Sequence, residues 1–269
     1  MRIGFIGTGA MARAIARGAV NGGLVGSDLL FTDINTEASA SLASELGATA
    51  IDSNIDLATQ ADLIVLAVKP HIQSLVIAEI ADTVRSRPQA VVVSIAAGRT
   101  LSTIIDDFGF GVRLVRVMPN VNAQIGQSMS SVCSANASDE DVAAVVKLME
   151  TVGRALVVPE SQFPAFQALA ACSPAWVFQM IEDLARAGVK HGLTKTTATQ
   201  IAAQAFAGSA ALVLDRQSCE GTVPSQLVDQ VCSPGGTTIA GLLAAQEHGL
   251  SSALVHAVDA AISRDAELS

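Results

Sequence analysis

Short apolar runs alternate with segments of helical spacing through the first half of the chain. Runs of this kind, bounded by turn residues, are typical of buried parallel strands, and the segments between them are typical of helices that cover a sheet. The predicted strands are 2–6, 29–32, 48–51, 63–68, 90–95 and 114–117. The predicted helices are 10–20, 36–46, 72–84, 101–108 and 138 to about 153.

The pattern changes near Pro159, beyond which apolar residues follow helical spacing alone. Ser173-Pro174 predicts a helix start that continues to Lys190, because serine caps helices and proline suits the first helical position. Thr194 is expected to cap a helix reaching about Arg216, and shorter helices are expected from about 224, 235 and 251. The predicted fold class is therefore α/β, with a mostly parallel Rossmann-type sheet in residues 1–158 and an all-helical domain in residues 159–269.

The first strand ends in a glycine turn. Gly7 and Gly9 allow a tight turn and close approach of the backbone to a ligand, and Ala12 takes the third small position of a G-x-G-x-x-G/A pattern. The helix that follows presents unpaired N-terminal amides, which bind phosphate. The succession of strand, glycine turn and helix predicts a dinucleotide-binding site. The alternative is a glycine turn that binds no ligand.

Thr32-Asp33 ends the second predicted strand, where an acidic residue binds the ribose 2′-hydroxyl in such folds. A carboxylate at Asp33 accepts hydrogen bonds from a ribose and repels a 2′-phosphate, and no arginine or lysine lies between Arg17 and Lys69. Taken alone, Asp33 favours NAD over NADP. The alternative is that Asp33 only begins the turn before Asn35, the expected cap of the next helix.

Other strands end in small or polar residues at the same predicted edge of the sheet. Lys69-Pro70 follows the fourth strand, and Ser94–Gly98 follows the next with small residues that let a flat ring approach the backbone. Met118-Pro119-Asn120 follows the strand after that. Together with the glycine turn, these ends predict one cleft.

A second glycine-rich run, Val231–Thr238, opens a helix in the predicted helical domain. Unpaired amides at such a start bind anions of the size of a carboxylate, and Thr237 and Thr238 add hydroxyl groups. An ordinary capped helix start is the alternative. None of the four histidines has the spacing of a metal site or a catalytic triad, so no metal is expected.

Composition narrows the functional class. The net charge of −9 argues against a nucleic-acid partner, and 50% apolar with 15% charged residues indicates much buried surface, including surface between subunits. The four cysteines form no C-x-x-C pair and are expected to be small buried thiols. The apolar stretch Ala198–Leu214 contains glutamines and falls short of a membrane span, and no signal peptide is evident. A soluble, cytoplasmic protein without a membrane partner is expected.

The order of these runs resembles that of the pyrroline-5-carboxylate reductase family. The resemblance extends from Arg2 to about Glu267, and its most specific part is the S-P-G-G-T-T run. The matching segments are G-x-G-x-M-A at 7–12, A-V-K-P at 67–70, S-I-A-A-G at 94–98, R-V-M-P-N at 116–120 and S-P-G-G-T-T-I-A-G-L at 233–242. The resemblance implies reduction of 1-pyrroline-5-carboxylate, a cyclic imine, to L-proline by NAD(P)H in proline biosynthesis.

The resemblance also implies roles for particular residues, with Thr238 matching the hydroxyl that bonds the imine nitrogen and serving as the catalytic residue. The predicted cofactor-binding residues are Ile6, Gly7, Thr8, Gly9, Ala10, Met11, Thr32, Asp33, Asn54, Ala67, Val68, Lys69, Pro70, Ala96 and Ala97. The predicted substrate-binding residues are Val231, Ser233, Gly235, Gly236, Thr237 and Thr238. Helical domains of the family interlock in a homodimer, which places this loop over the partner's cofactor cleft, and dimers often form decamers.

Two departures from the family pattern keep alternatives open. Ala170–Trp176 stands where S-G-S-x-P-A-Y is usual, and Asp33 stands where a serine often favours NADP. A reductase of a related cyclic imine and a nucleotide-binding protein without turnover therefore remain alternatives. A β-hydroxyacid-type dehydrogenase would carry a lysine in the first helix of the α-domain, and Ser173–Arg186 contains none.

Overall fold

A computed structural model describes residues 1–268 of the chain. It contains two compact units, one of Met1–Ala171 with the end of the chain from Ile262, and one of Cys172–Ala261. The sheet ends at Val157, close to the predicted change at Pro159, but the units divide later, because Phe163 and its neighbours pack into the core of the sheet unit. The predicted division at 158/159 stays a prediction, and Ser269 lies outside the described residues.

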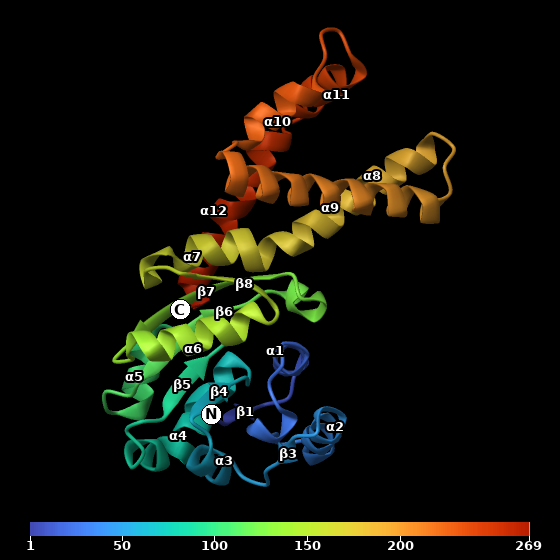
Figure 1. The fold of residues 1–269 in the computed structure, drawn as a ribbon. Helices are drawn as coiled ribbons and strands as arrows, with labels where there is room; N and C mark the ends of the chain where they lie inside the picture. The colour runs from blue at the N-terminus through green and yellow to red at the C-terminus, as the bar shows by residue number, and fades with distance from the viewer. Residues whose placement is uncertain (269) are drawn as a thin grey trace. The chain divides into compact units, whose positions relative to one another are not determined.

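The first unit is an α/β unit in which strands and helices alternate (Figure 1). Its strands are β1 Ile3–Ile6, β2 Leu29–Thr32, β3 Thr49–Ala50, β4 Leu63–Leu66, β5 Val91–Ser94, β6 Leu114–Met118, β7 Ser128–Ala135 and β8 Gly153–Val157. Its helices are α1 Ala10–Asn21, α2 Thr36–Leu46, α3 Asn54–Gln60, α4 Pro70–Arg85, α5 Leu101–Phe108, α6 Asp139–Glu150 and α7 Phe163–Phe166, with short turns η1 Gly26–Asp28, η2 Val121–Ile125 and η3 Glu160–Gln162. The π-helical turn η4 Gln167–Cys172 follows α7.

The second unit consists of helices joined by short turns. It contains α8 Ser173–Lys190, α9 Lys195–Glu220, α10 Pro224–Val231, α11 Thr237–Glu247 and the beginning of α12 Leu250–Leu268. The side chain of Thr194 accepts a hydrogen bond from the Thr197 amide and caps α9, as predicted. These five helices confirm the predicted all-helical character of the second domain.

The strands form an eight-stranded sheet in the order β3-β2-β1-β4-β5-β6-β7-β8. All neighbouring pairs are parallel except β6 with β7, which confirms the predicted Rossmann-type, mostly parallel sheet. The order reverses between β1 and β4, and ligands bind at such a switch point beyond the carboxyl ends of the strands. The glycine turn follows β1 at this position.

Helices cover both faces of the sheet. One face packs against α1, α2 and α6, with the stacked rings of Phe5 and Phe31 5.6 Å apart near its centre. The other face packs against α3, α4 and α5, and Phe163 closes that core. Val, Ile and Leu make up all of β4 and all of β5 except Ser94, and β1 is Ile-Gly-Phe-Ile, because these strands are buried on both faces. Two hydrophobic cores therefore hold the carboxyl ends of the strands in place.

Several predicted local features differ from the structure. Strands β7 and β8 and helix α3 were not predicted, and α4 begins at Pro70 rather than Ile72. The predicted serine cap at Ser173 is wrong, because the preceding Cys172 already has helical dihedral angles and the chain runs on from η4 into α8. Cys133 is buried, and burial raises the pKa of its thiol to about 12, but Cys219 is exposed, so not all thiols are buried as expected.

Helix α9 is longer than predicted, with 26 residues that end at Glu220. Among residues 1–268 it is the one helix long and apolar enough to cross a membrane, so the prediction that this stretch is too short was wrong. Length and composition alone are weak evidence for a span, because the core helix of a soluble protein can pass the same test.

We expect Gly18→Ala to destabilise the sheet unit. A Cβ atom at Gly18 of α1 would lie 2.2 Å from Val152 Cγ1 and 2.9 Å from the Thr151 carbonyl oxygen, so the helix would have to move away. Overpacking costs about 1–3 kcal/mol, against about 1 kcal/mol gained in helix propensity. Urea unfolding should show a net loss of up to about 2 kcal/mol. Asn21→Ala, at an exposed position of α1, is the control, and equal stability of both variants would contradict the expectation.

Candidate active site

The turn after β1 depends on Gly7. Its φ of +99° is a left-handed conformation that favours glycine, and a Cβ atom there would lie 2.9 Å from the carbonyl oxygen of Ala67. The Gly7 amide donates a hydrogen bond to the Thr32 carbonyl oxygen at 2.8 Å, which holds the turn against the end of β2. The ends of β1, β2 and β4 are thereby brought together around one turn.

The start of α1 can hold a pyrophosphate. Gly9 is the N-cap residue and has no side chain to accept hydrogen bonds from the first amides of the helix. Apart from Gly9 and its two chain neighbours, no atom of residues 1–268 lies within 4 Å of the position that a Cβ atom would take at Gly9, so a ligand can approach the backbone closely there. The first amides of α1 and the positive end of its dipole favour an anionic ligand. These features fit the phosphates of a dinucleotide.

A cavity of about 660 Å³ lies along these strand ends. Most of the predicted cofactor-binding residues line it, which are Gly7, Gly9, Ala10, Met11, Asp33, Ala67, Val68, Lys69, Pro70, Ala96 and Ala97. The remaining lining residues are Ala14, Ile34, Ile72, Ile95, Pro119, Asn120, Val121, Gln124 and Ala171. The structure therefore brings the predicted strand ends together in one cleft. That these residues bind the cofactor stays a prediction.

Asp33 is held at the rim of this cavity by three hydrogen bonds. Its Oδ2 accepts from the amide of Thr8 at 2.6 Å and from the Thr8 hydroxyl at 2.9 Å, and its Oδ1 accepts from the Asn35 amide at 2.9 Å. Partial burial alone would raise the pKa of Asp33, but the hydrogen bonds from Asn35 and Thr8, together with the nearby charge of Arg13, lower that pKa below its usual value. Asp33 is thus an ionised acceptor at neutral pH.

Four predicted cofactor-binding residues do not line the cavity. Ile6, Thr8 and Thr32 are buried. The carbonyl oxygen of Ile6 accepts from the Ala67 amide at 2.9 Å, and Thr8 and Thr32 hold the turn through their hydrogen bonds with Asp33 and Gly7. Asn54 begins α3, and its side-chain amide donates to Glu79 Oε2 at 2.6 Å. The role of Asn54 at the cofactor therefore stays a prediction that the cavity lining does not support.

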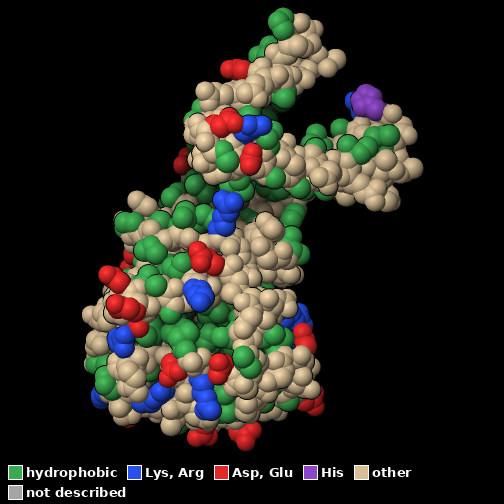
Figure 2. All heavy atoms as spheres, viewed as in Figure 1, with side chains coloured by type: hydrophobic (Ala, Val, Ile, Leu, Met, Phe, Trp, Pro, Cys, Tyr) green, Lys and Arg blue, Asp and Glu red, His purple; other side chains and the backbone are tan. Residues whose placement is uncertain are grey.

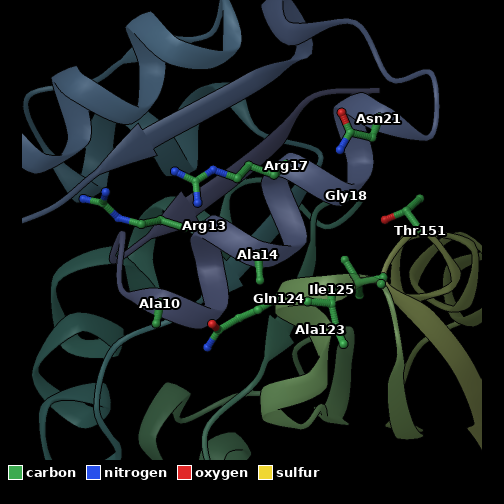
Figure 3. A pocket seen from close by; sticks show the side chains of 12 residues that line it. Ala10, Arg13, Ala14, Arg17, Gly18, Asn21, Ala123, Gln124, Ile125 and Thr151 are labelled. Carbon is green, nitrogen blue, oxygen red and sulfur yellow. The ribbon is translucent and has the colours of Figure 1, made fainter. Parts of the chain in front are cut away.

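Sequence reasoning missed part of the cavity wall, including Ile34, Ile72 and Gln124. Gln124 belongs to η2, and together with Ala10 and Ala14 it also lines a neighbouring pocket of about 580 Å³ (Figure 3). Figure 3 shows the side chains of Arg13 and Arg17 extending from α1, away from Thr151. Arg17 is paired with Glu45, with Nε and Oε1 2.6 Å apart. A short loop after a strand end gives no periodic signal, so Gln124 could have been found only from its proximity to Met118-Pro119-Asn120.

The predicted substrate-binding residues form one turn in the helical unit, between α10 and α11. Gly235 has a φ of +66°, which favours glycine. A Cβ atom at Gly236 would lie 2.4 Å from Ser233 Oγ, so the serine side chain would have to move to admit one. Gly236 caps α11 without a side chain, which leaves the first amides of the helix available. The exposed Thr237 and Thr238 follow at once. This geometry suits a carboxylate, although the role of each residue remains a prediction.

Comparison with known proteins places the chain in a family. Residues 160–268 match the family model for pyrroline-5-carboxylate reductase dimerisation, and residues 2–98 match that for coenzyme F420-dependent NADP oxidoreductase. The pyrroline-5-carboxylate reductase of Methanosarcina acetivorans is 35% identical over 269 residues, which cover 99% of this chain and 97% of the relative. The chain belongs to the pyrroline-5-carboxylate reductase family. The enzyme of that name from Escherichia coli is 36% identical over 271 residues and is covered to 98%.

Solved structures of pyrroline-5-carboxylate reductases share the fold over the whole chain. The structure from Coxiella burnetii has a TM-score of 0.92 at 31% identity and covers 100% of this chain and 98% of its own. A structure from Plasmodium falciparum, solved with NADP bound, has a TM-score of 0.85 at 27% identity over 100% and 98% of the two chains. The family therefore accounts for both units, and its members are NAD(P)H-dependent oxidoreductases that act on a C=N bond.

Proposed function

We propose that this protein reduces 1-pyrroline-5-carboxylate to L-proline with NADH or NADPH, as a step of proline biosynthesis. The observation that carries the proposal is the combination of a nucleotide cavity at the β1–β4 switch point with a glycine-rich, carboxylate-sized turn at α11. Relatives named pyrroline-5-carboxylate reductase at about 35% identity support the same reaction. In this division, residues 1–158 bind the cofactor, and residues 159–269 bind the substrate and a second subunit.

The residues of the sheet unit bind and orient the cofactor in this proposal. The α1 amides after Gly9 hold the pyrophosphate, and Asp33 accepts hydrogen bonds from the adenosine ribose. Ala96 and Ala97 have side chains small enough to let the nicotinamide ring approach the end of β5. A bound nicotinamide cofactor supplies the hydride.

The residues of the α11 turn orient the substrate. The first amides of α11, after Gly236, receive the carboxylate of pyrroline-5-carboxylate. The Thr238 hydroxyl then hydrogen-bonds the imine nitrogen and holds it in place. Threonine is too weak an acid to drive proton transfer alone, so Thr238 acts mainly by orientation, which is what reduction of a protonated imine requires.

We also propose that two chains associate through their helical units. In one chain the buried residues of α9 are Ala198 and Ala202, and large apolar side chains such as Ile201 and Leu212 are about half exposed. Figure 2 shows hydrophobic side chains at the surface of the helical unit. Apolar patches of this extent mark protein interfaces, and the match to a dimerisation model supports a second copy as the cover rather than a lipid bilayer. Further assembly to a decamer follows the habit of the family, and the absence of an evident signal peptide supports a cytoplasmic location.

Association can be measured directly. Light scattering after size-exclusion chromatography should give at least twice the 27.5 kDa mass of one chain, without detergent. Ile201→Glu should lower the mass toward that of one chain, because it places a charge in the apolar surface, whereas Glu37→Gln on α2 should leave the mass unchanged. A monomeric wild-type protein would contradict the proposed interface.

The reaction itself is tested by following the absorbance of NADH and of NADPH at 340 nm with pyrroline-5-carboxylate, and by identifying proline as the product. Oxidation of one cofactor with stoichiometric proline is the expected result. Oxidation of neither would refute the proposed function.

A further inference from the structure

A buried hydrogen-bonded chain lies behind the wall of the cavity formed by residues 95–97. Gln73 of α4 is fully buried, and its side-chain amide donates to Ser94 Oγ at 2.8 Å, where Ser94 ends β5 and is itself fully buried. The carbonyl oxygen of the Gln73 side chain accepts from Arg99 Nε at 3.3 Å. Arg99 is also paired with Asp107 of α5. A buried glutamine is therefore satisfied on both sides by residues distant in sequence.

The loop after β5 is otherwise weakly held. The amide of Ala96 donates to Ser94 Oγ, and the amide of Ile95 donates to the Leu66 carbonyl oxygen, each over 3.4 Å. These bonds are long compared with the usual 2.9–3.0 Å or so of an N–H···O bond, so they fix the loop poorly by themselves. The short Gln73–Ser94 bond fixes the oxygen atom on which the Ala96 amide depends.

Gln73 also lies next in sequence to a second wall of the cavity, although it does not line the cavity itself. Residues 67–70 line that wall and lead directly into α4, and Ile72, the neighbour of Gln73, lines it as well. The Gln73 side chain thus joins the wall that begins α4 to the wall that ends β5. Any change in its length or hydrogen bonding alters the separation of the two walls.

We propose that Gln73 is a positioning residue that sets this separation and thereby the seat of the nicotinamide ring. The inference rests on the proposed function in one respect, that the nicotinamide lies against Ala96 and Ala97. Gln73 acts through Ser94 and touches neither cofactor nor substrate. Its effect is confined to the nicotinamide end, because the adenosine end is held by α1 and Asp33.

Removal of the Gln73 amide tests the proposal through two ligands. Gln73→Leu keeps the approximate volume but removes the shorter of the two hydrogen bonds that Ser94 Oγ accepts and leaves Arg99 Nε without its acceptor. The dissociation constant of NADH, measured by fluorescence titration, should rise about tenfold. That of ADP-ribose, which lacks the nicotinamide, should stay within about twofold by calorimetry. A merely structural role would weaken both ligands together.

Three further variants control the measurement. Gln73→Glu can accept from both Arg99 Nε and the Ser94 hydroxyl, so it should keep the wild-type ratio of the two dissociation constants within about threefold. Ile80→Val removes a methyl group from a fully buried residue of the same helix without touching the network, and should leave the ratio unchanged. If Gln73→Leu does not fold, Ser94→Ala breaks the same bond and carries the same expectation.

Two outcomes would overturn the proposal, namely an unchanged ratio in folded Gln73→Leu or Ser94→Ala, or an equal loss of affinity for NADH and ADP-ribose. Both measurements use binding to the full-length protein and need no turnover. A wild-type protein that binds NADH but does not reduce pyrroline-5-carboxylate would refute the proposed reaction while this binding test still decides the role of Gln73.

Discussion

Thr238→Ala should lower the turnover number for pyrroline-5-carboxylate about 100-fold while the dissociation constant of NADH stays unchanged. Thr238 is exposed near the start of α11, and its hydroxyl makes no hydrogen bond within residues 1–268, so it is available to a substrate. Alanine is the best helix former and preserves the amides after Gly236. The substitution therefore removes the group that orients the imine nitrogen and keeps the carboxylate site.

Thr238→Ser is the matched control, because it retains a hydroxyl at the same place and should keep turnover within about fivefold of the wild type. Steady-state rates with saturating cofactor separate turnover from the KM for pyrroline-5-carboxylate, and fluorescence titration gives the affinity for NADH. A Thr238→Ala variant with wild-type turnover would show that this hydroxyl is not the orienting group.

The parts of the fold that sequence predicted well are those that depend on neighbours along the chain. Asn35, Thr100 and Ser138 each cap the helix expected, because a side-chain oxygen bonds an amide three residues on. The glycine turn was predictable for the same reason, since its conformation depends on the absence of a side chain at Gly7. The cleft followed from topology once the parallel sheet was predicted.

The parts that were missed depend on tertiary contacts. Strand β7 is rich in serine and gives no apolar run, yet it is buried between β6 and β8. Its polar groups are partly satisfied within the sheet unit, as where Ser128 Oγ accepts from the amide of Asn120 at 3.2 Å. Helix α3 has seven residues, too few for a clear period. The partners of Gln73 lie 21 and 26 residues away along the chain, so that network was also invisible in the sequence.

Replacing Asp33 by serine should shift cofactor preference toward NADPH, raising the ratio of kcat/KM for NADPH to that for NADH about 100-fold. The wild type should prefer NADH, because the three hydrogen bonds to Asp33 hold an ionised carboxylate where a 2′-phosphate would approach. Because the pKa of Asp33 is lowered, its side chain stays ionised near neutral pH, and the repulsion of a 2′-phosphate persists in assays in that range. Serine removes the charge and can still accept from the Thr8 amide.

Glu37→Ser is the control that separates the effect of a charge at the cavity from the effect of net charge on cofactor preference. Glu37 lies in the first turn of α2, a few residues from Asp33, and does not line the cavity. Its loss changes the net charge as much as Asp33→Ser does, but solvent screens the effect on the cofactor. The preference should therefore change less than about threefold. A wild-type protein that already prefers NADPH would show that Asp33 does not exclude the phosphate.

Arg13 should supply the attraction that the Asp33→Ser variant uses. Its Nε donates to the Thr8 carbonyl oxygen at 2.8 Å, and this is the one hydrogen bond that its side chain makes within residues 1–268. Thr8 also donates hydrogen bonds to the Asp33 carboxylate, so the Arg13 guanidinium group and the Asp33 carboxylate both bond the same buried residue. Adding Arg13→Met to Asp33→Ser should lower kcat/KM for NADPH at least about tenfold, because the 2′-phosphate loses the positive charge that attracts it. The kcat/KM for NADH should stay within about threefold, because NADH has no 2′-phosphate. Arg17→Met in the same background should have no such effect, since Arg17 is already paired with Glu45. Equal losses with both cofactors would mean that Arg13 supports the turn and not the phosphate.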